Sequence, residues 1–245
     1  NLKAKTVKFP WELIVNLAAG LAADWPALKM KKRKYQVHKS TVLLNKQQIY
    51  FDDGVEIEAG AVIDARHGPV YIGRGTIIRP LTYLKGPLSI GPLCRIGGEV
   101  GESIFHGYTN KQHYGFIGHA YVGEWVNLGA GTTNSDLKNN YGTVKVQIDG
   151  KLVDSQEQFV GCFIGDHAKT GIGALINTGT LIGVGANVMG GKPTPKIVPD
   201  FYWDEKTKYR AEDFIKTAKL MMARRGIAID QAETDKLRKV YKLAA

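Results

Sequence analysis

The sequence contains little cysteine and no long apolar run. Cys94 and Cys162 are the only cysteines among 245 residues, and no CxxC spacing is present. No apolar stretch approaches the about 18 residues of a membrane-spanning helix, and no signal-like segment stands out. These features argue against a disulfide scaffold and a membrane protein, and they predict a reducing, cytoplasmic location.

Acidic residues are too few to balance the basic ones, and the net charge is +10 at pH 7. The excess lies at the two ends, because residues 41–204 carry 13 Lys and Arg against 15 Asp and Glu. The short basic run 29–34 has no base-reading or base-stacking residues beside it, so a nucleic-acid interface is not favoured. We interpret the run as a solvated linker.

Glycine is almost absent outside the middle of the chain, since all but two of the 29 glycines lie within residues 54–191. Before this segment, residues 9–25 predict one packed helix. After it, residues 211–225 and 232–241 show helical spacing, with Asp230 placed as an N-cap. The predicted domains are a helical connector with a basic linker over 1–40, a central domain over 41–204 and a C-terminal helical extension over 205–245.

The central segment repeats a hexad, clearest from Ile164 in IGDHAK, TGIGAL, INTGTL, IGVGAN and VMGGKP. A six-residue period spreads its marked positions over three sides of an α-helix, so no amphipathic helix results. In strands an even period points every marked side chain inward, and glycine permits the tight turns. The chain is therefore predicted to wind as a β-solenoid. The marked positions are Ile57, Ile63, Ile72, Ile78, Leu84, Ile90, Ile96, Ile164, Thr170, Ile176, Ile182 and Val188, of which Thr170 alone is polar.

The repeat is interrupted twice, after Gly101 and again over about 134–160. Between the two breaks it resumes at IGHAY and continues through VGEWVN and LGAGTT. A solenoid that only presents a surface has no need of such breaks, and function is usually grafted where a repeat departs from its own rule. We therefore place the candidate site at this interruption.

The string HYGFIGHAYVGEWVNLGAGTT from His113, with Arg79-Pro80 before it and AKLMMARRGI after it, resembles the hexapeptide-repeat acyltransferases. The resemblance is to the acetyltransferase half of the divergent bacterial bifunctional N-acetylglucosamine-1-phosphate uridyltransferase/glucosamine-1-phosphate acetyltransferases, from about Thr41 to the end. It implies a mainly β fold, a left-handed parallel β-helix with an N-terminal helix and C-terminal α-helices. It also implies a homotrimer with active sites between subunits. The implied reaction moves acetyl from acetyl-coenzyme A to the amine of an amino-sugar phosphate, as in UDP-N-acetylglucosamine synthesis.

The resemblance further implies roles for single residues. His113 is at the position of the general base, Arg79 at that of a phosphate ligand and Asn127 at that of a sugar ligand. The cofactor-contact positions are Ala130, Gly131, Ile172 and Gly190. Lys111, Asn134 and Lys138 are candidate substrate ligands by proximity in sequence alone. Phe116 stands where the better-known form has tyrosine, and Asp136-Leu137 where it has an asparagine-tyrosine pair.

The chemistry agrees with these residue types. A sugar amine that attacks a thioester must lose a proton, and an imidazole with a pKa of about 6.5 can accept it. The charge that develops on the thioester oxygen needs fixed donors, and the glycine-flanked backbone N–H groups of residues 129–131 can approach it closely. Acetyl-coenzyme A enters as a co-substrate, and the reaction requires no metal.

Two other functions stay open on the sequence alone. His106, His113 and His119 are candidate ligands of a metal-dependent, carbonic-anhydrase-like site, and the solenoid is a candidate noncatalytic trimerising tail of a sugar nucleotidyltransferase. His113 is also a candidate turn histidine, and Asn127 and Asn134 tolerate left-handed corners. The LAAG at residues 17–20 lacks the glycine-rich continuation of a nucleotidyltransferase, so we expect no uridyltransferase activity from these residues.

Overall fold

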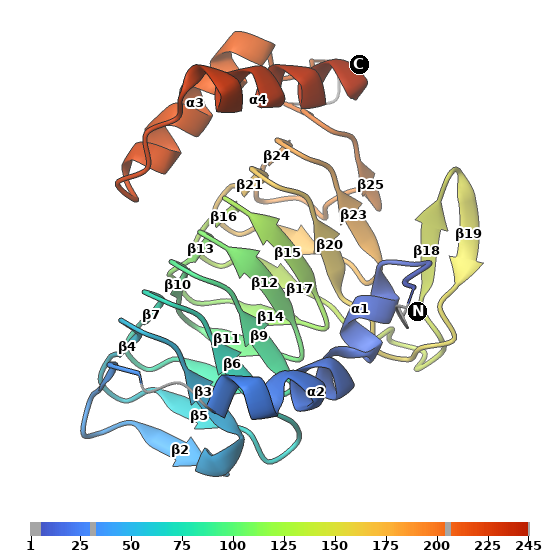
Figure 1. Cartoon of the computed structure of the whole chain (residues 1–245). Coiled ribbons are helices and arrows are strands. Elements are labelled where there is room, and N and C mark those ends of the chain that lie inside the picture. Colours follow the sequence, from blue (N-terminus) through green and yellow to red (C-terminus); the bar gives the residue numbers. More distant parts are fainter. Residues whose placement is uncertain (1–5, 30–32, 204–206, 245) are drawn as a thin grey trace, which may run out of the picture.

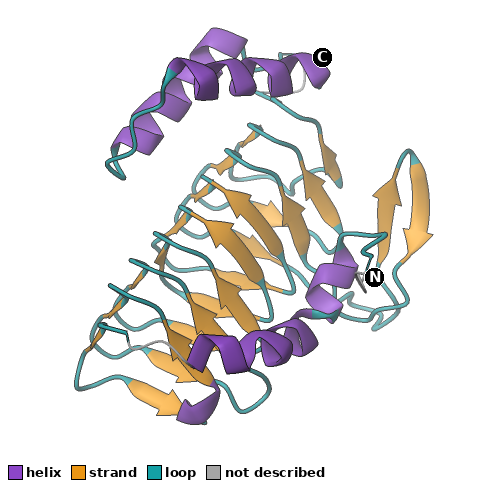
Figure 2. Cartoon of the chain, viewed as in Figure 1, coloured by secondary structure: helices purple, strands orange, loops and turns teal. Residues whose placement is uncertain are grey.

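The computed structural model describes residues 6–29, 33–203 and 207–244. Its centre is a β-solenoid in which the chain contributes strands, turn after turn, to three faces that we call A, B and C (Figure 1). The C-terminal helices lie across one end of the solenoid, and the N-terminal helices lie along its side (Figure 2). The parallel β-helix with N-terminal and C-terminal helices is thus confirmed.

Faces A and C are eight-stranded sheets, and face B is a five-stranded sheet continued by a two-stranded one; all the ladders within these faces are parallel. Face A contains β1 (Gln36–Val37), β4 (Glu56–Ile57), β7 (Ile77–Ile78), β10 (Arg95–Ile96), β13 (Asn110–Lys111), β16 (Asn127–Leu128), β21 (Lys169–Thr170) and β24 (Asn187–Val188). Face B contains β2 (Val42–Leu44), β5 (Val62–Asp64), β8 (Tyr83–Lys85), β11 (Glu99–Gly101), β14 (Phe116–Gly118), β17 (Thr133–Asn134) and β22 (Leu175–Ile176). Face C contains β3 (Ile49–Phe51), β6 (Val70–Ile72), β9 (Leu88–Ile90), β12 (Ile104–Gly107), β15 (Tyr121–Glu124), β20 (Cys162–Ile164), β23 (Thr180–Ile182) and β25 (Ile197–Val198). The turns that join the faces are called the A–B, B–C and C–A corners.

The hexad positions form the core of the solenoid, as the even period requires. Every apolar marked residue is buried, and Ile78 and Ile96 pair directly in neighbouring turns. The one polar member, Thr170, is also inside, where its hydroxyl lies 2.6 Å from that of Thr132 and accepts a hydrogen bond from the Gly129 amide. A buried hydroxyl that has these partners costs the core little.

The C–A corner is built from large residues in left-handed backbone conformation rather than from glycine alone. Tyr108, Trp125 and His167 have φ values of 55°, 59° and 60°. Each of their amides donates to a carbonyl of the turn below, as from His167 to Glu124 at 2.8 Å, and this pairing offsets the cost of the conformation. The Tyr108 and Trp125 rings stack at 4.2 Å, so this corner presents an aromatic ridge.

The N-terminal segment forms two helices, so the single helix predicted over residues 9–25 is wrong. Helices α1 (Trp11–Val15) and α2 (Leu17–Lys29) are separated at Asn16, whose side-chain amide donates to the Glu12 carbonyl at 2.7 Å. Such local bonds compete with a continuous helix. Both helices pack on the side of face C (Figure 1). Residues 30–32 of the predicted basic linker lie outside the described residues.

The second interruption of the repeat is an antiparallel hairpin, β18 (Lys145–Ile148) and β19 (Lys151–Asp154), inserted between β17 and β20. Its residues Val144 and Val146 share an apolar cluster with Trp11 of α1. The insertion therefore extends beyond the solenoid and is held against the N-terminal helices. A short 3-10 helix, η1 (Lys46–Gln48), marks a B–C corner near the start.

Helices α3 (Ala211–Ala223) and α4 (Gln231–Leu243) lie across the C-terminal end of the solenoid (Figures 1 and 2). Asp230 caps α4 by accepting the Glu233 amide hydrogen bond at 2.8 Å, which confirms the predicted N-cap. The predicted boundary between residues 204 and 205 falls within 204–206, outside the described residues. Among the described helices, none has the length and apolar character needed to cross a bilayer.

Candidate active site

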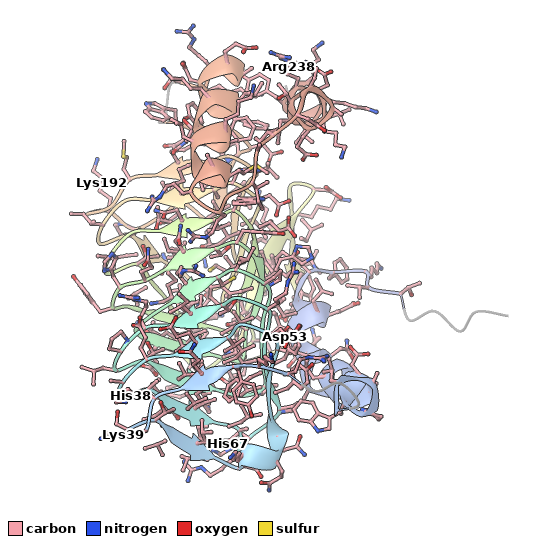
Figure 3. All side chains as sticks on the ribbon, turned by 60° about the vertical axis from the view of Figure 1, so that its left-hand side comes forward. His38, Lys39, Asp53, His67, Lys192 and Arg238 are labelled. Carbon is pink, nitrogen blue, oxygen red and sulfur yellow. The ribbon has the colours of Figure 1, made fainter. Side chains whose placement is uncertain are left out.

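Six of the ten predicted site residues lie along one edge of the solenoid, the A–B corner. They lie in the turns that follow β7, β13, β16, β21 and β24, and the turn after β10 separates the first two. In Figure 3 this edge is on the left, between Lys39 near the N-terminal end and Lys192 near the other. The six are Arg79, His113, Ala130, Gly131, Ile172 and Gly190.

The lower part of this corner holds Arg79 and His113 two turns apart, with Gly97 between them. A Cβ at Gly97 would lie 3.3 Å from the Cβ of Arg79 and 2.3 Å from the Gln112 carbonyl oxygen, so the close spacing of these turns requires glycine. The Arg79 guanidinium pairs with Glu58 at 2.7 Å. His113 is exposed, and its imidazole makes no hydrogen bond within the described chain.

Lys111 lies directly beneath His113, inside the solenoid. Its side chain is 2% exposed, and its ammonium donates to the carbonyl oxygens of Gly97 at 2.7 Å and His113 at 2.9 Å. Burial lowers the pKa of this ammonium to about 8. These two hydrogen bonds hold the His113 turn in place. They also keep the ammonium of Lys111 inside the solenoid, away from the surface where a phosphate would bind.

The upper part of the corner brings the predicted cofactor positions together. The Gly173 amide donates to the Ala130 carbonyl at 2.8 Å, and a Cβ at Gly190 would lie 1.6 Å from the Ile172 carbonyl oxygen. The backbones of these three turns therefore stack without side chains between them. The Ile172 side chain is 77% exposed and lies outside the stack.

Of the three glycine-flanked amides expected to stabilise an oxyanion, two are already used within the solenoid. The Gly129 amide donates to Thr170, and the Gly131 amide donates to the Tyr114 carbonyl at 2.9 Å. The amide of Ala130 donates to no group in the described chain. Among these three amides it is therefore the one that can donate to a new partner.

Face B carries a cavity of about 400 Å³ that the sequence analysis did not predict. Its centre is a pair formed by His119 and Asp136, whose Nδ1 and Oδ2 atoms are 2.8 Å apart. Glu102 Oε2 lies 3.7 Å from the same nitrogen and Glu102 Oε1 pairs with Lys85 at 2.9 Å. The lining includes Lys85, Glu102, Phe116, His119, Asp136 and Phe159.

The carboxylate of Asp136 orients the His119 imidazole. An Nδ1–H that donates to Asp136 leaves the lone pair on Nε2, so this ring can accept a proton or a hydrogen bond. The ring also stacks on Phe159 at 5.2 Å. His119 lies in the IGHAY stretch where the repeat resumes, and Asp136 and Phe159 lie in the second interruption. No spacing in the sequence pairs His119 with Asp136, and the contact appears only once the insertion folds back.

The remaining predicted ligands lie away from the A–B corner. Asn134 is buried, and its side-chain amide accepts from the Gly118 amide at 2.8 Å and donates to the Gly118 carbonyl at 2.9 Å, which joins β17 to the turn below. Lys138 donates to the Thr143 carbonyl at 3.1 Å within the insertion. Asn127 is on face A and lines a second cavity beneath α3.

The three histidines considered as metal ligands occupy three different places. His106 on β12 pairs with Glu124 at 3.1 Å, His113 is at the A–B corner and His119 is at the B–C corner. Across residues 6–29, 33–203 and 207–244, no three His, Cys, Asp or Glu side chains form a group that could hold a metal ion.

The chain is similar in sequence to curated bifunctional enzymes, while no family model matches it. It is 35% identical over 149 residues to a bifunctional sugar-1-phosphate nucleotidylyltransferase/acetyltransferase of Sulfurisphaera tokodaii, covering 60% of this chain and 36% of that protein. It is 31% identical over 152 residues to the bifunctional protein GlmU of Synechococcus elongatus, covering 60% and 28%. The chain thus matches little more than a third of these relatives at most.

Solved structures with a similar trace include AntD, an N-acyltransferase from Bacillus cereus, at a TM-score of 0.32 and 15% identity, covering 80% of this chain and 95% of that one. The sequence relationship is the informative comparison, because it extends over 60% of this chain. The chain is therefore a β-solenoid that is similar, over 60% of its length, to part of the bifunctional sugar-1-phosphate nucleotidylyltransferase/acetyltransferases.

Proposed function

We propose that the protein is an N-acetyltransferase that moves acetyl from acetyl-coenzyme A to the amine of an amino-sugar phosphate, with glucosamine 1-phosphate as the first candidate. The observation that carries the proposal is the A–B corner. There a solvent-facing imidazole, a backbone amide without a partner in the described chain and three turns with closely stacked backbones lie on one edge. Acetylation of an amine by a long thioester cofactor needs a proton acceptor, a donor to the thioester oxygen and a surface for the cofactor, and these three features can supply them.

In the proposed reaction the lone pair of the neutral amine forms a bond to the thioester carbonyl carbon, and the carbonyl π electrons move to its oxygen, where the Ala130 amide stabilises the charge. His113 accepts the one proton that the nitrogen loses as this bond forms. Collapse of the tetrahedral adduct expels the coenzyme A thiolate. The proton held by His113 returns to the thiolate, so the products are an N-acetyl sugar phosphate and free thiol.

The cofactor is proposed to lie along the stacked turns of Ala130, Gly131, Ile172 and Gly190. Gly131 and Gly190 carry no side chain, so a pantetheine chain can approach the backbone closely at these two positions. Arg79 is the proposed phosphate ligand, although its guanidinium must share its charge with Glu58. Asn127 lies on face A and Lys138 in the insertion, outside the A–B corner itself. We propose that a homotrimer brings neighbouring corners and faces together into one site.

The acceptor sugar is proposed to occupy the face B cavity beside the corner. Phe116 lines this cavity and follows His113 by only three residues, which corresponds to no more than about 10 Å along an extended chain. Aromatic walls from Phe116 and Phe159 and polar groups from His119 and Asp136 are typical of sites that bind a carbohydrate ring. We further propose that the protein works in the cytoplasm on precursors of UDP-N-acetylglucosamine.

A thiol-release assay tests the proposal directly. The protein is incubated with acetyl-coenzyme A and glucosamine 1-phosphate, galactosamine 1-phosphate or glucosamine 6-phosphate, and free thiol is followed with a chromogenic disulfide. N-acetylglucosamine 1-phosphate is the matched control, since its nitrogen is already acylated. We expect thiol release with at least one free amine and none above background with the control. Equal release with and without a free amine would identify a thioesterase instead.

A further inference from the structure

A second cavity, of about 180 Å³, lies between the C-terminal end of α3 and face A. Its lining includes Asn110 and Asn127 from neighbouring strands, Lys169 from the next strand, and Arg224 and Arg225 from the end of α3. The three strand residues are in register, so their side chains leave face A in one row at about 4.8 Å intervals. No carboxylate is part of the lining.

The charges of this cavity have no counterion in the described chain. Lys169, Arg224 and Arg225 form no ion pair there, and Arg95 on the adjacent strand adds a further positive charge. Burial lowers the pKa of Lys169 to about 8, and burial together with Arg95 and Arg224 lowers that of Arg225. Like charges gathered in a partly desolvated place repel one another, and an anion between them removes that cost.

The hydrogen bonds that these cations make are to neutral groups. Arg225 donates to the Leu93 carbonyl at 3.3 Å and to the side-chain oxygen of Asn110, and Lys169 donates to the His167 carbonyl at 2.8 Å. Such bonds satisfy donors without neutralising charge. The Asn127 side chain makes no hydrogen bond within the described chain, so its amide is available to a ligand.

The negative end of the α3 dipole gives Arg224 and Arg225 one favourable neighbour. That effect explains cations at a helix end, but it does not explain why Lys169 and a free amide meet them from the opposite wall. The two walls come from parts of the chain that are distant in sequence. Their convergence points to a ligand that is shared between α3 and the solenoid.

We propose that this cavity is an anion site that binds a phosphate monoester group. Lys169 and the two arginines supply charge, and the amide of Asn127 supplies a further donor. A phosphate carries up to two negative charges and several acceptor oxygens, which match this mixture of guanidinium, ammonium and amide. The site bridges α3 and face A, so occupation ties the C-terminal helices to the solenoid. The proposal does not depend on acetyl transfer.

Inorganic phosphate is the probe in the first experiment. Its dissociation constant is measured by calorimetry for the full chain at constant ionic strength, with chloride as the exchanged anion so that screening stays the same. We expect Lys169→Gln to weaken binding at least tenfold, whereas Lys219→Gln, an exposed lysine on α3, leaves it unchanged. Asn127→Asp keeps every described contact and adds a negative charge, so it should abolish binding even if an arginine variant fails to fold.

The source of the phosphate is separated by two matched ligand pairs. Glucosamine 1-phosphate is compared with glucosamine, and coenzyme A with dephospho-coenzyme A. If the affinity difference within one pair disappears in Lys169→Gln, that pair identifies the molecule whose phosphate group binds in the cavity. If Lys169→Gln weakens binding of inorganic phosphate alone, the site is one for free phosphate. Absence of saturable phosphate binding by the wild-type protein would overturn the proposal. So would equal affinity in the wild type and Asn127→Asp.

Discussion

The two corners that bound face B hold their histidines in opposite ways. At the A–B corner His113 is exposed, without a hydrogen bond to its ring in the described chain. At the B–C corner His119 is 19% exposed and is fixed by Asp136 at 2.8 Å. Six residues separate the two in sequence, which moves a side chain from one corner of the coil to the next. One short stretch of sequence therefore supplies an accessible imidazole to one side of face B and an oriented imidazole to the other side.

The largest expected effect comes from removing the accessible imidazole. For His113→Ala we expect the rate of thiol release at saturating substrates to fall by ~10² to 10⁴, or about 3 to 5 kcal/mol, because a general base is lost. Acetyl-coenzyme A binding should be largely kept. Steady-state kinetics and calorimetry of cofactor binding measure the two quantities separately.

The same measurement on His119→Ala sharpens the comparison. If His113 is the proton acceptor, His119→Ala should raise KM for the sugar phosphate and leave most of kcat. A fall in kcat larger than that of His113→Ala would transfer the role of base to the oriented pair at the B–C corner. A normal rate in His113→Ala would remove this residue from the chemistry.

Lys111 under the A–B corner predicts a pH-dependent stability. Its pKa is about 8 in the folded protein against an ordinary value of 10.5, so the unfolded chain binds more protons between these pH values. The contribution of Lys111 to the free energy of unfolding therefore rises with pH across that window, by up to about 3 kcal/mol. Below pH 8 both states carry the proton, and this contribution is flat.

Urea unfolding of the wild type and Lys111→Met at pH 7 to 11 measures this effect. The difference in unfolding free energy should grow in favour of the wild type as pH rises, because methionine does not titrate. Lys145→Met on the exposed side of the hairpin is the control and should show no such trend. A flat difference for Lys111→Met would mean that its ammonium is solvated in the folded protein.

Much of the fold could be predicted from the hexads, because an even period in strands fixes which side chains are buried. Ile78, Ile96 and Ile182 are inside as predicted, and Thr170 could be recognised as an inward polar residue. The hairpin that replaces the second break could not be predicted in detail, since its packing on Trp11 joins parts of the chain more than a hundred residues apart.

Some residues of the candidate site could likewise be predicted from the repeat, and others could not. Arg79, His113 and Ala130 each follow a face A strand, so the repeat itself aligns them at one corner. The pairing of His119 with Asp136 depends on how the irregular insertion leaves β17, and the repeat carries no information about it. Lys111 was predicted to be a substrate ligand but is buried. The turn length changes after Gly101, so the hexad pattern could not show that the Lys111 side chain points inward.

A smaller loss of stability is expected from disturbing the close backbone contact at the A–B corner. In Gly190→Ala the new methyl group would lie 1.6 Å from the Ile172 carbonyl oxygen, so the last turns must separate, and we expect a loss of about 2 kcal/mol. Gly173→Ala is the matched change, since open space surrounds it and only its φ of 68° costs about 1 kcal/mol. Thermal unfolding and acetyl-coenzyme A affinity should both be affected more by the first. Equal effects would show that the turns do not need their close spacing.

The smallest expected effect is at the oriented histidine itself. Asp136→Asn keeps an oxygen that can accept the Nδ1–H bond of His119 but removes the charge that strengthens it, and charge-assisted bonds are roughly twice as strong as neutral ones. We expect KM for the sugar phosphate to rise about threefold to tenfold, with little change in kcat. Asp149→Asn, at the exposed tip of the hairpin, is the control for loss of one negative charge. Because the amide can flip and present its nitrogen instead, Asp136→Leu gives the upper limit of the effect. A kcat loss that follows the order Leu, Asn, wild type would show that the B–C corner takes part in proton transfer and not only in holding the acceptor.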